Sequence, residues 1–132
     1  MLTTNEFLSA VLPSSGTYCV VGLKKDERPK QKFVNTIEEV EELAKKLVQA
    51  EYDAYFALAT YSNATDGRTA KNAATFKSYF LDLDCGLGKP YADQAEGLAA
   101  LKQFLKDTGL PKPTVVNSGR GVHAYWVLDA EI

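Results

Sequence analysis

The segment at residues 80–84, Phe-Leu-Asp-Leu-Asp, decides how this chain is predicted to fold. Its acids alternate with leucines, and an alternation of this kind has the two-residue period of a β-strand. The leucines therefore belong to one face of the strand, and Phe80, Asp82 and Asp84 belong to the other. We expect the leucine face to pack on helices and the two carboxylates to lie on an open face of a sheet.

A second segment, residues 118–123, has the sequence Ser-Gly-Arg-Gly-Val-His and leads into another apolar strand. In that strand Val122, Ala124 and Trp126 share one face, and His123 and Tyr125 share the other. If both strands turn their apolar faces toward the helices, the histidine emerges on the same open face as the two aspartates. This convergence is the main inference that periodicity alone supplies.

Helical periodicity predicts two amphipathic helices. A Thr-x-x-Glu capping box at residues 36–39 precedes the apolar positions of a helix over 37–50. A similar signal at residues 93–96 begins a second helix, which Gly109 ends. Strands are predicted at 17–23, 53–60, 76–84, 113–117 and 122–128.

The order β-α-β-β-α-β-β predicts an α+β fold, with a mostly antiparallel, RRM-like sheet and two helices on one face. Residues 5–12 are expected to add a short helix. Residues 24–32 form either a polar loop or an extended hairpin arm, and residues 61–75 form a polar loop.

The composition indicates one soluble domain over residues 1–132, with 45% hydrophobic and 24% charged residues. Apolar runs are too short to cross a membrane, and the two cysteines show no disulfide or metal spacing, which favours a cytoplasmic location. The net charge of −2 argues against nucleic-acid binding over the whole protein surface. Any contact must be local; the basic cluster at 24–32 is one candidate, and a solvated loop is the alternative.

Asp82 and Asp84 are candidate metal ligands because side chains two residues apart on a strand lie roughly 6.5–7 Å apart. Carboxylates at this spacing can bridge two cations held about 3.5–4 Å apart. Ligands that are all oxygen favour Mg²⁺ or Mn²⁺. The alternative is that both acids are simply solvated at the end of a strand.

The segment 118–123 offers a hydroxyl, flexible glycines, a guanidinium and an imidazole. Such a turn can bind phosphate oxygens through backbone N–H groups and the fork of Arg120. The alternative is an ordinary hairpin turn with an incidental arginine and a histidine satisfied in a polar crevice. Tyr52, Tyr55 and Phe56 likewise suit either a platform for stacked bases or, more simply, a core.

Together, residues 80–86 and 113–126 resemble the archaeo-eukaryotic primase superfamily, and most closely its phage and plasmid primase-polymerases. The resemblance implies that Asp82 and Asp84 are catalytic and bind Mg²⁺ or Mn²⁺. It implies that Ser118, Arg120 and His123 bind the nucleoside triphosphate and that His123 is also catalytic. The implied reaction is nucleotidyl transfer to a 3′-hydroxyl on a single-stranded DNA template.

The family's third motif, an acid some distance after the histidine, has no counterpart here, since Asp129 and Glu131 follow too closely. We therefore expect the N-terminal part of a catalytic domain, inactive alone, from the cytoplasm of a bacterial cell or phage-infected host. A helicase in the full-length chain is a candidate partner. The alternative to a truncated enzyme is a small protein that keeps the fold without full activity. Two alternatives stay open: a non-catalytic RRM-like module that binds single strands or nucleotides, and another two-metal phosphotransferase or nuclease.

Overall fold

The computed structural model describes residues 2–132 and divides them into two compact units. The first unit comprises the chain up to Lys77 together with Asp129–Ile132, and the second comprises Ser78–Leu128. Every strand pair within a sheet is antiparallel. Within residues 2–132, no helix has the length and apolar character needed to cross a bilayer.

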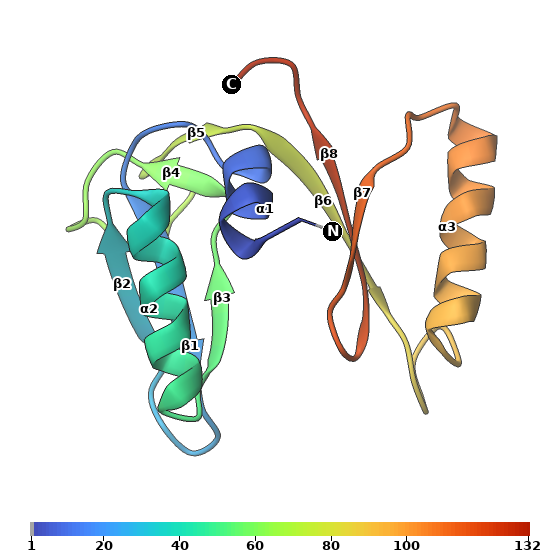
Figure 1. The fold of residues 1–132 in the computed structure, drawn as a ribbon, viewed down its shortest axis with the longest axis horizontal. Helices are drawn as coiled ribbons and strands as arrows, with labels where there is room; N and C mark the ends of the chain where they lie inside the picture. Colours follow the sequence, from blue (N-terminus) through green and yellow to red (C-terminus); the bar gives the residue numbers. More distant parts are fainter. Residues whose placement is uncertain (1) are drawn as a thin grey trace. The chain divides into compact units, whose positions relative to one another are not determined.

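The described part of the first unit contains two helices and five strands (Figure 1). Its sheets have the orders β2-β1-β3 and β4-β5. The elements, in chain order, are α1 (Thr4–Val11), β1 (Tyr18–Leu23), β2 (Lys30–Val34), α2 (Ile37–Gln49), β3 (Asp53–Phe56), β4 (Ala59–Tyr61) and β5 (Ala73–Phe76).

Helix α2 begins where the sequence predicts, because the Thr36 hydroxyl accepts a hydrogen bond from the Glu39 amide at 3.1 Å. It runs along one face of the β2-β1-β3 sheet (Figure 1). At that interface, a Cβ added to Gly22 would stand 2.8 Å from the Leu47 side chain. The absence of a side chain at Gly22 therefore lets the helix approach the central strand closely.

The second unit is a three-stranded sheet with one helix. The sheet order is β6-β8-β7, and the elements are β6 (Ser78–Asp84), α3 (Gln94–Thr108), β7 (Thr114–Asn117) and β8 (Gly121–Val127). Helix α3 begins at the N-cap Asp93 and ends at Gly109, which has a left-handed φ of 72°. The core joins sheet and helix, and its buried residues are Leu83, Cys85, Leu101, Val122 and Ala124.

The α+β class, the antiparallel pairing and both long helices are confirmed, and the short N-terminal helix is present. The prediction of one sheet is wrong, because the strands within residues 2–132 form three sheets of three, two and three strands. The predicted polar loop at 61–75 includes the first three residues of β5, which begins with two small, exposed alanines that show no alternation. Residues 30–34 form a strand, as the hairpin alternative required. The single domain over 1–132 stays a prediction.

Candidate functional site

The acids and the histidine of the two key segments lie on one face of the second unit's sheet. Strands β6 and β8 pair so that Asp82 is directly opposite His123, and Asp84 is opposite Gly121. Phe80 is opposite Tyr125 in the next pair on the same face. We call this surface, with Phe80, Asp82, Asp84, His123 and Tyr125, the acid face.

Helix α3 lies against the opposite face of the same sheet. Leu83 and Val122 are directly opposite each other there, and so are Leu81 and Ala124. These side chains belong to the core that Leu101 of α3 completes. The face assignment made from alternation alone is therefore confirmed in the second unit.

Asp82 and His123 are in contact on the acid face. The Nε2 atom of His123 is 3.4 Å from Oδ1 of Asp82, a distance that makes an ion pair when the imidazole is protonated. The Asp82 side chain is half exposed at 50%, whereas that of His123 is 27% exposed. The carboxylate therefore stays open to solvent, and to a ligand, on one side.

Aromatic rings flank this pair. The Phe80 ring lies 5.0 Å from the His123 ring in an edge-to-face arrangement and 5.1 Å from the ring of Tyr125. Tyr125 is buried, and its burial, together with the nearby charge of Asp82, raises its pKa to about 12. Tyr125 is therefore a neutral phenol at physiological pH and adds no charge to the acid face.

The turn between β7 and β8 is held by its own backbone and by Ser118. The Ser118 hydroxyl accepts from the Gly121 amide at 3.1 Å, and the Ser118 amide donates to the Gly121 carbonyl at 3.1 Å. Gly119 adopts a left-handed φ of 90°, which favours glycine. A Cβ on Gly121 would collide with the Leu83 carbonyl oxygen of β6, so this position also requires glycine.

A groove of about 680 Å³ lies at the same end of the sheet. It is bounded by the end of β6, the loop that follows, the start of α3 and the β7–β8 turn. We call it the hairpin groove; its charged lining residues are Asp84, Lys89, Asp93 and Arg120. Asp93 is engaged as the N-cap of α3, where it accepts from the Glu96 amide at 2.8 Å. Two cationic side chains thus face one carboxylate that is not committed to a helix.

Gln94 holds the β7–β8 turn against helix α3. Its side-chain amide donates to Oδ1 of Asn117 at 2.7 Å and to the Gly121 carbonyl at 3.1 Å. The Cys85 amide also donates to the Arg120 carbonyl at 3.3 Å. These bonds fix the backbone of Arg120 on both sides, while its guanidinium makes no ion pair or hydrogen bond within residues 2–132.

The acids of this region suit a hard divalent cation but do not enclose one. No group of three or more His, Cys, Asp or Glu side chains in residues 2–132 is spaced to hold one metal ion. Asp82 and Asp84 would therefore supply part of a ligand set, with phosphate oxygens and water supplying the rest. Mg²⁺ is commonly bound in this way, through one or two carboxylates plus substrate phosphates.

The predicted site residues thus fall into two neighbouring groups. Asp82 and His123 meet on the acid face, whereas Asp84 and Arg120 line the hairpin groove. The Ser118 hydroxyl oxygen accepts a hydrogen bond within the turn, so Ser118 can donate its hydroxyl proton to a ligand. The sequence reasoning missed Lys89, whose position in a Gly-Leu-Gly-Lys loop directly after the acidic strand was the available signal.

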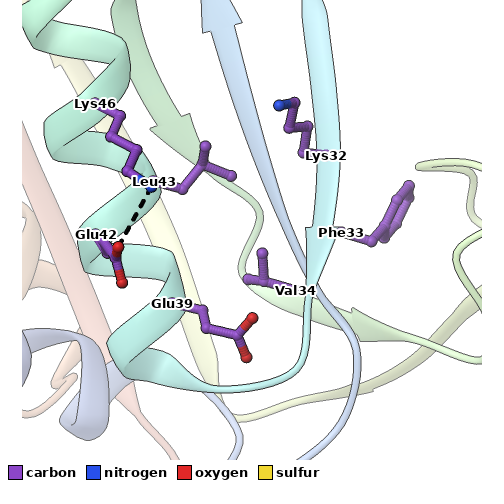
Figure 2. A pocket seen from close by; sticks show the side chains of 7 residues that line it. All are labelled: Lys32, Phe33, Val34, Glu39, Glu42, Leu43 and Lys46. Carbon is purple, nitrogen blue, oxygen red and sulfur yellow. Dashed lines mark ion pairs between the residues drawn. The ribbon is translucent and has the colours of Figure 1, made fainter.

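A second cavity, of about 240 Å³, lies between β2 and α2 in the first unit. Figure 2 shows Val34 and Leu43 directed into the space between helix and strand, while Phe33 points away from the helix. Glu42 and Lys46 form an ion pair at 3.3 Å along the same helix. Glu39, Glu42 and Lys46 belong to the exposed side of α2, and Lys32 is exposed on β2. These charges are solvated, so we do not assign the cavity a catalytic role.

Comparison of the chain with protein-family models, with curated proteins and with solved structures found no match.

Proposed function

We propose that this chain carries the nucleotide site of a DNA primase or primase-polymerase. In the proposed reaction, a 3′-hydroxyl on single-stranded DNA attacks the α-phosphorus of a nucleoside triphosphate. The bond from the α-phosphorus to the bridging oxygen breaks, pyrophosphate leaves, and the hydroxyl proton passes to water. The observation that carries the proposal is the register of β6 and β8, which pairs Asp82 with His123 beside a groove that holds Asp84 and Arg120. Acids, an imidazole and a guanidinium are the groups that nucleotidyl transfer needs, because catalysis there is mostly positioning and charge stabilisation.

Each residue has a proposed part in the reaction. Asp82 and Asp84 would hold Mg²⁺ or Mn²⁺, which supplies a positive charge beside the reacting phosphate. Arg120 and Lys89 would bind the outer phosphate oxygens, and Ser118 would donate its hydroxyl proton to one of them. His123 would remain close to Asp82 and donate a ring N–H to a phosphate oxygen from the acid face.

Charge makes this binding dependent on metal. A triphosphate that approaches the hairpin groove meets two cations, Lys89 and Arg120, but also the carboxylate of Asp84. Without a metal, Asp84 and the neighbouring Asp82 repel the phosphates. We therefore expect nucleoside triphosphates to bind in the presence of Mn²⁺ and much more weakly in its absence.

The test is a calorimetric titration of a nucleoside triphosphate into wild type and into the Asp82→Ala/Asp84→Ala double variant, with and without Mn²⁺. Wild type should bind much more weakly without Mn²⁺ than with it. With Mn²⁺, the double variant should bind at least about tenfold more weakly than wild type, as expected when a charge-assisted contact worth about 1.5–3 kcal/mol is lost. The matched control is Asp53→Ala/Asp107→Ala, which removes two exposed aspartates elsewhere. Equal Mn²⁺-dependent binding by all three proteins would overturn the proposal.

Two further readouts separate the proposal from its alternatives. If the protein bound single-stranded DNA in the absence of metal and did not bind a nucleoside triphosphate, a non-catalytic module would be favoured. Cleavage of a labelled strand in place of its extension would favour a nuclease. Extension is expected only if the further acidic ligand is supplied, because two-metal sites normally use more carboxylates than Asp82 and Asp84.

A further inference from the structure

Phe80 is an exposed aromatic residue in the middle of the acid face. Phe80 is 43% exposed, whereas Leu83 on the other face of β6 is buried in the core with α3 and Leu81 packs against it. Single exposed aromatic residues are common on protein surfaces and by themselves need no explanation. The surroundings of Phe80 are what distinguish it.

The Phe80 ring is held by two neighbouring rings. The buried Tyr125 lies directly opposite it on β8, with the two centroids 5.1 Å apart. His123 lies diagonally across, and its ring meets that of Phe80 edge to face with the centroids 5.0 Å apart. Because these contacts hold one side of the ring, the ordering cost of a ligand that packs on its open side is reduced.

The chemical character of the acid face changes in order along strand β6. The cationic residues Arg120 and Lys89 lie at the groove end, beyond Asp84. Asp82 follows two residues back along the strand, and Phe80 two residues further. Each step is roughly 6.5–7 Å, so a ligand that extends along β6 meets cations first, then carboxylates, then an aromatic ring.

A nucleoside triphosphate has the same order of groups from its outer phosphates to its base. We propose that Phe80, backed by Tyr125, packs against the sugar and base of the nucleotide whose phosphates bind at Asp82, Asp84 and Arg120. This inference rests on the proposed function and adds the orientation of the nucleotide along the strand. It assigns Phe80 to nucleoside binding, a role that neither the acids nor the hairpin groove supplies.

The chemistry of an aromatic ring also fixes what kind of selectivity the contact gives. Stacking and apolar contact are available to every base, because each base has a π-face, and they carry no hydrogen-bond code. A template-directed enzyme needs such tolerance, since the template must choose the base. The four common nucleoside triphosphates should therefore depend on Phe80 to a similar extent.

The experiment compares two ligands that share the phosphate chain, a nucleoside triphosphate and inorganic tripolyphosphate, both with Mn²⁺. Phe80→Ala should weaken binding of the nucleoside triphosphate roughly 5- to 100-fold, the range found for single base–aromatic contacts. It should leave tripolyphosphate binding unchanged within about twofold, a difference well under the 1.4 kcal/mol that corresponds to tenfold. Phe80→Trp should preserve both affinities, because it keeps an aromatic surface.

Tyr79→Ala is the matched control, since Tyr79 is 54% exposed and lies on the other face of the same strand. It should change neither affinity. The inference on Phe80 is overturned if Phe80→Ala binds the nucleoside triphosphate as wild type does, or if it loses both ligands equally. The proposed function fails separately, if wild type binds both ligands equally well without Mn²⁺ or if Asp82→Ala/Asp84→Ala binds them as tightly as wild type.

Discussion

Two hairpin turns of this chain, one in each unit, both carry cationic residues, but these residues make different contacts. At the turn between β1 and β2, the ammonium groups of Lys24 in the turn and of Lys30, the first residue of β2, lie 4.9 Å and 4.7 Å from the centre of the Tyr52 ring. Lys24 also donates to the Ala50 carbonyl at 3.0 Å and pairs with Glu27 at 3.6 Å. In this turn, positive charge is used to attach the hairpin to its own unit.

In the turn between β7 and β8, hydrogen bonds to the backbone close the turn and join it to its own unit. Ser118, Gly119 and Gly121 close the turn, and Gln94 ties it to helix α3. The guanidinium of Arg120 is left to line the hairpin groove. The two turns therefore differ in what their cations contact: Lys24 and Lys30 lie against Tyr52 of their own unit, whereas Arg120 lines a groove.

The largest expected effect tests whether glycine geometry builds the second turn. Gly121→Ala places a Cβ against the Leu83 carbonyl oxygen of the neighbouring strand, so backbone must move. We expect a loss of about 3 kcal/mol or more in the free energy of unfolding, at the upper end of the cost of overpacking. Urea unfolding, followed by circular dichroism, measures it.

Gly119→Ala is the control in the same turn. No atom lies within 4 Å of a Cβ added there, so only its left-handed φ of 90° opposes the change. That conformation costs roughly 1–2 kcal/mol for a residue with a side chain. If the two variants lost the same stability, close approach of β8 to β6 would not be what demands glycine at 121.

The next effect tests the separation of binding from stability. Arg120→Ala should weaken Mn²⁺-dependent triphosphate binding roughly 10- to 100-fold, as expected when one charge-assisted contact worth about 1.5–3 kcal/mol is removed. Its stability should change by less than about 0.5 kcal/mol, because the exposed side chain makes no ion pair within residues 2–132. Calorimetry and urea unfolding of the same samples measure both quantities.

Arg28→Ala removes the same charge from the β1–β2 turn and is the matched control. Arg28 is exposed and should leave both binding and stability close to those of wild type. A similar loss of binding in the two variants would mean that overall charge, and not the shape of the second turn, attracts the triphosphate.

The predictions from sequence succeeded where alternation was unbroken. In β6 and β8 the two-residue period placed Asp82 and His123 on one face, and the core with α3 formed on the other. The period could not supply the register, because sliding one strand by two residues keeps every face and changes every partner. That Asp82 is opposite His123, and Asp84 opposite Gly121, is information that only the structure contains.

Elements without a pattern were missed or misjudged. Strand β5 begins with two exposed alanines and is set by pairing with β4, where the hydroxyls of Thr60 and Thr75 meet at 2.6 Å. The three aromatic residues predicted to form either a base-stacking platform or a core lie in different environments. Tyr52 is buried under lysines, Phe56 packs on Phe7 with the rings 6.1 Å apart, and Tyr55 is 51% exposed. Tertiary contacts decide such positions, and local sequence does not encode them.

The smallest expected effect tests the first turn, where charge serves stability. Tyr52→Leu keeps an apolar side chain but removes the ring beneath Lys24 and Lys30 and the hydroxyl that donates to Glu27 at 3.4 Å. We expect a loss of about 1–2 kcal/mol, since each exposed cation–π contact is worth about 0.5–1 kcal/mol. Nucleotide binding should stay at the wild-type level.

Tyr55→Leu, at an exposed position three residues on, is the matched control and should cost less than about 0.5 kcal/mol in the same urea titration. If Tyr52→Leu instead weakened triphosphate binding and left stability intact, the lysines of the first turn would form part of a ligand site, and the contrast between the two turns would not hold.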